Sequence, residues 1–302
     1  MSLIRPILNA YLRLTEKPHM RRAQRPEQLR RPFEIKARLF FHGPRGVAAR
    51  WDDLGAVAAL ELEPATPRDG PTILYFHGGG YVFGSPNTHR AMLAQLVRRT
   101  GLSARLPRYR LAPEHPFPAA LEDALSAYDA LAAQAPGGIV LGGDSAGGGL
   151  ALALLGEILS SDRTPPLGLF AFAPLTDMGF TGASVRDNAE SEVVLAPERA
   201  SALAEMVLQG ADPDDPRASP LHMEFTGAPP VWLAASDTEI LLDDTRRLTA
   251  RMRAQGVPVD EIIEHDLPHV WPIFHNLLPE ARATLDQVAG WISSLSRPSA
   301  GS

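Results

Sequence analysis

The sequence predicts an α/β protein whose mostly parallel sheet is covered by helices on both faces. Strand-like and helix-like segments alternate over most of the 302 residues, which is typical of parallel sheets with helical crossovers. Several of the strand-like segments are almost wholly apolar, as strands buried on both faces are. The composition, 45% hydrophobic and 21% charged, indicates a globular protein with a sizeable core.

Each element follows from its own pattern of apolar residues. Strands are expected at residues 58–63, 72–76, 102–106, 138–142, 168–173, 230–235 and 259–264. Helices are expected at residues 87–100, 118–134, 146–160, 197–208, 240–254 and 279–295. Ligands of such sheets bind beyond the carboxyl ends of the strands, so the residues directly after each strand are the first candidates for function.

Two long segments lie outside this alternation. Residues 1–50 precede the first expected strand and hold twelve Lys or Arg against three Glu. A basic arm for nucleic acid or membrane is one interpretation, but apolar residues at helical spacing favour amphipathic helices with a solvated basic face; these are Ile4, Ile7, Leu8, Tyr11 and Leu12. Residues 178–228 form a long excursion with Pro-rich turns, which predicts a lid over the ligand site. The tail from Arg297 to Ser302 is expected to be disordered.

Composition excludes several classes of function. The chain has no cysteine, so disulfides, thiol catalysis and Cys-based metal sites are ruled out. A net charge of −6 gives no reason to expect a nucleic-acid partner. The sequence shows no secretory signal and no apolar run long enough to span a membrane, so a cytoplasmic protein without a membrane partner is expected.

A candidate nucleophile follows the expected strand at residues 138–142. Gly143-Asp144-Ser145-Ala146-Gly147 has the G-x-S-x-G pattern of a nucleophile elbow. A serine on a tight strand-to-helix turn needs small neighbours two residues away on either side. The helix N-terminus then points at the reacting centre, where it favours negative charge.

A serine hydroxyl needs a base, and the base needs an orienting acid. His269, in the loop after the strand at 259–264, is the expected base, ahead of His265 and His275. Asp237 comes directly after the strand at 230–235 and is the expected acid, with Glu239 as the second candidate. This order of Ser, acid and His along the chain is typical of the elbow pattern.

Three consecutive glycines follow the apolar strand at residues 72–76, in His77-Gly78-Gly79-Gly80. Bare backbone there allows a ligand to approach closely. The amides of Gly78, Gly79 and Ala146 are expected to converge on the oxyanion of a tetrahedral intermediate. A phosphate cradle is disfavoured because neither G-x-G-x-x-G nor a P-loop pattern is present. His77 is expected to brace the loop.

These motifs together resemble the hormone-sensitive-lipase-like carboxylesterases, which are α/β-hydrolases. The resemblance covers about residues 45 to 295 and rests on His77–Gly80, Tyr109–Pro116, Gly143–Gly147 and the pair Asp237 and His269. It implies a serine esterase of short- to medium-chain acyl esters without metal or cofactor, with Ser145, Asp237 and His269 as triad. It also implies a helical cap from residues 1–45 and about 180–210 over a catalytic domain of residues 46–302. A homodimer is expected on this resemblance alone.

Two departures from the family pattern concern Arg108 and the acid loop. Arg108 stands where the family often has an acidic residue, and a change in local salt bridges is expected. The acid loop after Asp237 is longer than the common form, which keeps Glu239 in contention.

Four further residues are candidates to line the substrate pocket. Tyr81, Phe83 and Trp271 are aromatics beside the catalytic positions, and Asp144 precedes Ser145. For the aromatics, core packing is an equal alternative. The block Tyr109–Pro118 is interpreted as scaffold, because its prolines restrict the loop beside the elbow.

Two other functions remain open for the same residues. An acyltransferase or amidase could use the same triad, and turnover of matched esters and amides would separate these from an esterase. A catalytically silent ligand receptor on this fold would lack reaction with an organophosphonate probe.

Overall fold

An eight-stranded sheet forms the centre of the computed structural model, which describes residues 2–295. Its strands are β1 Val47–Leu54, β2 Val57–Pro64, β3 Thr72–Phe76, β4 Ala104–Pro107, β5 Ile139–Asp144, β6 Gly168–Phe172, β7 Val231–Ser236 and β8 Val259–Glu264. They are arranged in the order β1-β2-β4-β3-β5-β6-β7-β8. β2 is antiparallel to both of its neighbours, and from β4 to β8 every pair is parallel. The predicted mostly parallel sheet is confirmed, and the tail predicted to be disordered lies outside the described residues.

The strand β1 is the one strand that the sequence pattern did not predict. It pairs only with β2, at the edge of the sheet, and its middle residues are exposed. A solvated edge strand needs no apolar run, so the sequence VAARWDDL gave no strand signal. Arg108 lies over the ring of Trp51 in this strand, 4.3 Å from the ring centre, which is a cation–π contact and not an altered salt bridge.

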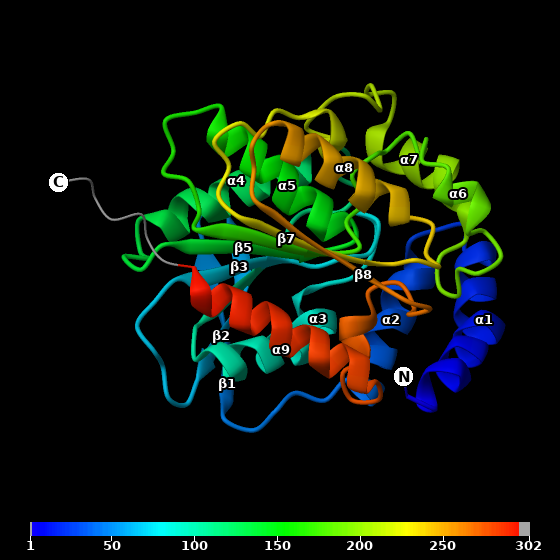
Figure 1. The fold of residues 1–302 in the computed structure, drawn as a ribbon, viewed down its shortest axis with the longest axis horizontal. Helices are drawn as coiled ribbons and strands as arrows, with labels where there is room; N and C mark the ends of the chain where they lie inside the picture. Colours follow the sequence, from blue (N-terminus) through cyan, green and yellow to red (C-terminus); the bar gives the residue numbers. More distant parts are fainter. Residues whose placement is uncertain (1, 296–302) are drawn as a thin grey trace.

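Helices cover both faces of the sheet (Figure 1). They are α3 Pro86–Thr100, α4 Ala119–Ala132, α5 Ala146–Leu159, α8 Leu242–Ala254 and α9 Pro279–Ser294. Alternate residues of the strands point to opposite faces. Leu74 and Phe76 therefore pack in the same cluster as the buried side of α5, whereas Ile73 and Tyr75 pack with α3 and α9 on the other face.

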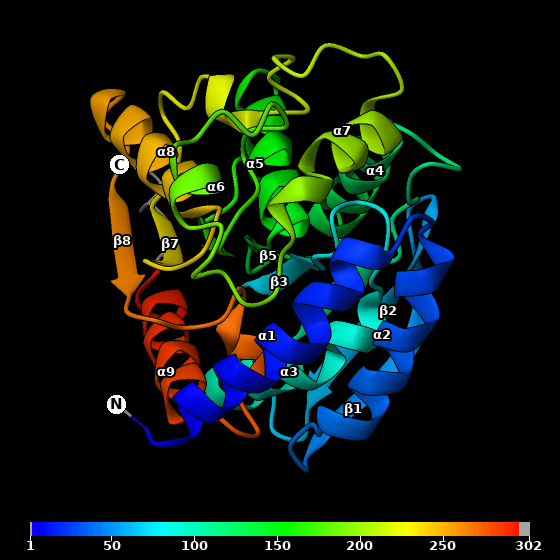
Figure 2. The same ribbon diagram turned by 90° about the vertical axis from the view of Figure 1, so that its right-hand side faces the viewer.

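The two remaining groups of helices lie at one end of the sheet, beyond the carboxyl ends of the parallel strands (Figure 2). One group is α1 Ile4–Arg22 and α2 Glu27–Phe40; the other is the excursion after β6, with α6 Ser184–Asp187 and α7 Ala200–Leu208. None of the helices among residues 2–295 has the length and apolar character needed to cross a bilayer.

The helix α1 differs from the expected amphipathic helix in the direction of its apolar residues. Leu8 and Leu12 are buried, as expected, but Ile4, Ile7 and Tyr11 are exposed. The helix α1 therefore has more apolar residues than its contacts with the rest of the protein bury, and the others remain on the surface.

Candidate active site

Ser145 lies in a tight turn between β5 and α5. Its backbone has φ 52° and ψ −124°, a conformation that residues other than glycine rarely adopt. A Cβ atom at Gly143 would overlap the carbonyl oxygen of Gly147, and one at Gly147 would overlap the carbonyl oxygen of Phe76. The elbow therefore needs glycine at both places, and it holds the serine at the carboxyl end of the sheet.

The imidazole of His269 is held by a buried carboxylate. Nδ1 of His269 donates to Oε2 of Glu239 over 2.6 Å, and the two side chains are 6% and 1% exposed. The other ring nitrogen, Nε2, is also buried and contacts no hydrogen-bonding partner among the described residues. Ser145 and His269 line the same cavity. This arrangement leaves Nε2 as the ring atom able to exchange a proton.

The predicted contact between Asp237 and His269 is not formed. The register of β7 and β8 places Ser236 opposite Glu264, so the next residues, Asp237 and His265, are also neighbours. The carboxylate of Asp237 accepts from Nδ1 of His265 over 2.7 Å and from the amide of Asp266 over 2.9 Å. His265 is 67% exposed, so this pair lies on the surface.

Glu239 reaches His269 because the chain turns back after β7. Its Oε1 accepts from the amide of Ser236, which places the side chain inside the turn and its Oε2 beside the imidazole. The sequence-based prediction chose the first acidic residue after the strand and did not anticipate this turn. The remaining candidate base, His275, is buried with Nε2 3.2 Å from the carbonyl oxygen of His42.

Burial alone would lower the pKa of His269, because it disfavours the charged imidazolium. The hydrogen bond to Glu239 and the negative charges of Glu239 and Glu192 outweigh burial, so the pKa is raised above its ordinary value of 6.5. Glu192 is itself buried, and burial raises its pKa. Glu192 lies within the long excursion after β6, where no local sequence pattern marks it as a site residue.

The excursion after β6 fixes the turn that carries Glu239. Oε2 of Glu192 accepts from the amide of Ile240 over 3.3 Å, and Nδ2 of Asn188 donates to the carbonyl oxygen of Glu239 over 2.8 Å. Lys17 of α1 is buried and donates to the carbonyl oxygens of Ala189 and Glu192 over 2.6 and 2.9 Å. The N-terminal helix is thus connected to His269 through three successive sets of hydrogen bonds: from Lys17 to the excursion, from the excursion to the turn, and from Glu239 to the imidazole.

The glycine loop after β3 lies beside the elbow because β3 and β5 are neighbouring parallel strands, with Phe76 opposite Gly143. Gly79 and Gly80 have φ of 121° and 59°. Within the described residues, the amides of Gly78 and Gly79 donate to no acceptor. The amide of Ala146 is at the first position of α5, where no intrahelical acceptor exists. Three donors are therefore available around Ser145.

The surrounding polar residues brace this loop. His77 Nδ1 lies 2.8 Å from the carbonyl oxygen of Gly78, and burial lowers the pKa of His77 to about 3, so the ring is neutral. Tyr109 donates to the carbonyl oxygen of His77 over 2.7 Å. Asp144 accepts from the hydroxyl of Tyr75 over 2.7 Å and lies 3.2 Å from Nε2 of His89. Both carboxylate oxygens of Asp144 are therefore occupied by the scaffold, although the residue lines the cavity.

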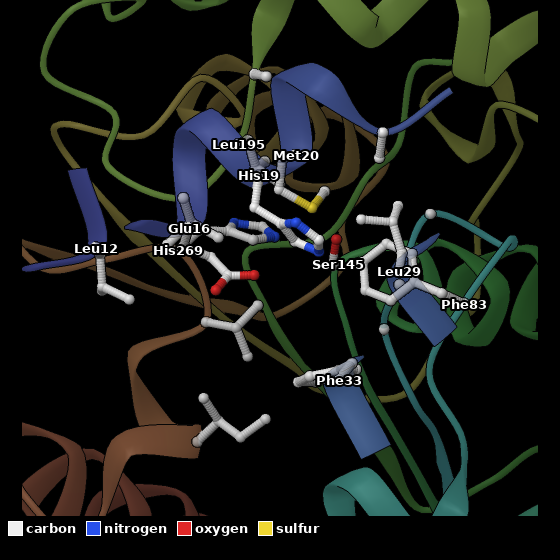
Figure 3. A pocket seen from close by; sticks show the side chains of 18 of the residues that line it. Leu12, Glu16, His19, Met20, Leu29, Phe33, Phe83, Ser145, Leu195 and His269 are labelled. Carbon is white, nitrogen blue, oxygen red and sulfur yellow. The ribbon is translucent and has the colours of Figure 1, made fainter. Parts of the chain in front are cut away.

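A cavity of about 550 Å³ lies above these groups, and most of its lining is apolar. Its walls come from α1, α2, the loop after β3 and residues 194–206. Phe83 lines it, as predicted, and Figure 3 shows its ring near Ser145. Trp271 does not: its side chain is fully buried in the core and donates to Thr284 over 2.9 Å. Tyr81 is likewise packed in the core and away from this lining.

His19 is a polar side chain of the cavity that the sequence patterns did not indicate. His19 of α1 points toward Ser145 and His269 (Figure 3), and its Nε2 is buried with no hydrogen-bonding partner among the described residues. Nothing in the local sequence distinguishes it from a surface histidine of an amphipathic helix. Only the fold brings α1 over the elbow.

The chain was compared with known proteins. The family model described as alpha/beta hydrolase fold matches residues 73–273. An acetyl-hydrolase of Streptomyces hygroscopicus is 38% identical over 239 residues, which are 78% of this chain and 79% of that protein. An esterase of Acinetobacter venetianus is 33% identical over 89% of both chains. The crystal structure of an esterase from the bacterial hormone-sensitive lipase family superposes with a TM-score of 0.91 and 34% identity, covering 98% of this chain and 99% of that one.

We expect the imidazole of His269 to titrate above pH 6.5, because Glu239 stabilises its charged form. Glu239→Gln removes that charge while burial remains, so the pKa of His269 should fall. Asp237→Asn, the matched control, should leave it unchanged. Histidine Cε1 NMR shifts followed against pH measure this, and a fall caused by Asp237→Asn in place of Glu239→Gln would contradict the assignment.

Proposed function

This chain belongs to the hormone-sensitive-lipase-like esterases of the α/β-hydrolase family, and we propose that it hydrolyses short- to medium-chain acyl esters through an acyl-enzyme on Ser145. The observation that carries this proposal is the buried pair of Glu239 and His269, whose free Nε2 lies in the same cavity as Ser145. A base with one nitrogen held by a carboxylate and the other free is what a serine nucleophile requires.

Acylation begins when Oγ of Ser145 attacks the ester carbonyl carbon and Nε2 of His269 takes the hydroxyl proton. Glu239 accepts the Nδ1 hydrogen bond and stabilises the imidazolium that forms. The amides of Gly78, Gly79 and Ala146 donate to the oxyanion, and one such donor contributes on the order of 3–4 kcal/mol to the transition state. The imidazolium then gives its proton to the leaving alcohol as the carbon–oxygen bond breaks.

Deacylation repeats these steps with water as the nucleophile. His269 takes a proton from water, the resulting hydroxide attacks the acyl carbon, and the proton returns to Oγ of Ser145. Because the protonated imidazole cannot act as a base, hydrolysis is lost as the pH falls through the raised pKa of His269.

The helices at the carboxyl edge form the cap in this proposal. Residues 2–45, with α1 and α2, and about residues 180–210 supply most of the apolar wall of the cavity. An apolar enclosure binds the hydrocarbon of the substrate and strengthens the hydrogen bonds to the oxyanion by excluding water.

Ser145→Ala should lower kcat for p-nitrophenyl butyrate by roughly 10⁴–10⁶, because the members of a triad act as a unit. Ser160→Ala, an exposed serine at the end of the same helix α5, is the matched control and should retain wild-type kcat. Near-wild-type hydrolysis by the Ser145→Ala enzyme would refute the acyl-enzyme.

The volume of the cavity sets the expected acyl-length limit. With monomeric p-nitrophenyl esters from acetate to palmitate, kcat/KM should fall steeply beyond about eight carbons, since a cavity of about 550 Å³ must also hold the alcohol. Constant kcat/KM up to palmitate would contradict this limit while leaving the acyl-enzyme intact.

A further inference from the structure

The large exposed apolar side chains of this protein are concentrated on the two N-terminal helices. Ten such residues occur among residues 2–295, and eight of them belong to α1, its N-cap or α2; these are Leu3, Ile4, Ile7, Tyr11, Leu14, Ile35, Leu39 and Phe40. Scattered exposed apolar residues are ordinary, but a contiguous group marks an interaction surface. We call the exposed side of α1 and α2 the cap face.

The cap face continues into the active-site cavity. Ile4, Ile7, Tyr11 and Phe40 line the cavity although each is 44% exposed or more, and Leu277, which lines the same cavity, is 46% exposed. These five residues form an apolar rim at the mouth. Leu14 and Leu39 are 78% and 62% exposed and lie outside the cavity lining, so the apolar surface extends beyond what a small substrate would touch.

The cap face is also basic. Residues 2–45 carry eleven Lys or Arg against three Glu, whereas the whole chain has a net charge of −6. Two of those glutamates are engaged: Glu16 pairs with Lys36, and Glu34 accepts a hydrogen bond from Ser85. Among the exposed arginines of residues 2–45, six form no ion pair with a described residue; these are Arg13, Arg22, Arg25, Arg31, Arg38 and Arg45.

We propose that the cap face docks on an anionic lipid surface and that esters dissolved in that lipid enter the cavity across the apolar rim. Helices with exposed apolar residues flanked by arginine bind such interfaces through apolar burial together with attraction to anionic headgroups. A symmetric contact between two copies would instead bring two basic faces together and cover the mouth. The use of lipid-phase esters rests on the proposed esterase function, whereas the docking does not.

Flotation with lipid vesicles tests the docking directly. The wild-type protein should float with vesicles of phosphatidylcholine mixed with phosphatidylglycerol, and much less with phosphatidylcholine alone. Raising the salt from about 0.05 M to about 0.5 M should weaken binding, because the Debye length shortens to a few ångström.

Two double variants separate the charge and apolar contributions. Arg22→Gln/Arg38→Gln should bind anionic vesicles roughly thirtyfold more weakly, since each arginine near such a surface contributes about 1 kcal/mol. The matched control is Arg68→Gln/Arg98→Gln. It removes the same charge from exposed residues near the amino ends of β3 and β4, at the end of the sheet away from the cap face. This control should bind like wild type. Leu14→Ser/Leu39→Ser should weaken binding at least tenfold.

Hydrolysis of monomeric p-nitrophenyl butyrate is measured on the same variants. It should be unchanged, because none of the substituted residues lines the cavity, so loss of vesicle binding is distinguished from loss of the active site. Wild-type protein that does not float with anionic vesicles overturns the proposal, as does equal binding by the cap variants and the control. A wild-type dimer in sedimentation velocity that Leu14→Ser/Leu39→Ser makes monomeric would assign the face to a second copy instead.

Discussion

The backbone of Ser145 is held at φ 52° and ψ −124° by the packing of the chain around it. A residue in such a conformation costs about 1–3 kcal/mol and persists only where its surroundings determine it. Here the surroundings are the carbonyl oxygens of Phe76 and Gly147, which leave no room for a side chain at Gly147 or Gly143. The same close approach of β3 and β5 places the glycine loop beside the serine.

The position of the base His269 also depends on the N-terminal helix α1. Lys17 of α1 holds the segment that carries Glu192, and that segment in turn fixes the backbone beside Glu239. Glu239 then orients His269. The helix α1 therefore does more than line the cavity, because these hydrogen bonds couple its position to that of the base. The helices α1 and α2 also line this mostly apolar cavity, and their exposed side carries further apolar and basic residues.

Much of the fold could be predicted from the sequence because runs of apolar residues indicate buried strands. Seven strands were predicted where strands occur, whereas β1 was missed because an exposed edge strand carries no such run. Ser145 and the glycines were found from local steric patterns.

The partner of His269 could not be found in this way. Whether Asp237 or Glu239 contacts His269 depends on the strand register and on one turn. Neither feature can be predicted from a local sequence pattern. His19 and Glu192 come from segments distant in the chain, so tertiary packing alone brings them to the site. Trp271 is an aromatic residue close to His269 in the sequence, as a pocket residue often is, but its side chain is packed in the core.

We infer that Glu239 is the carboxylate that orients the base His269. The most direct test compares kcat/KM for p-nitrophenyl butyrate in Glu239→Gln and Asp237→Asn, two variants with the same chemical change two residues apart. Glu239→Gln should lower kcat/KM by roughly 10⁴, as removal of a triad acid does, and Asp237→Asn should stay within a few-fold of wild type. A large loss in Asp237→Asn with Glu239→Gln near wild type would instead assign the orienting role to Asp237.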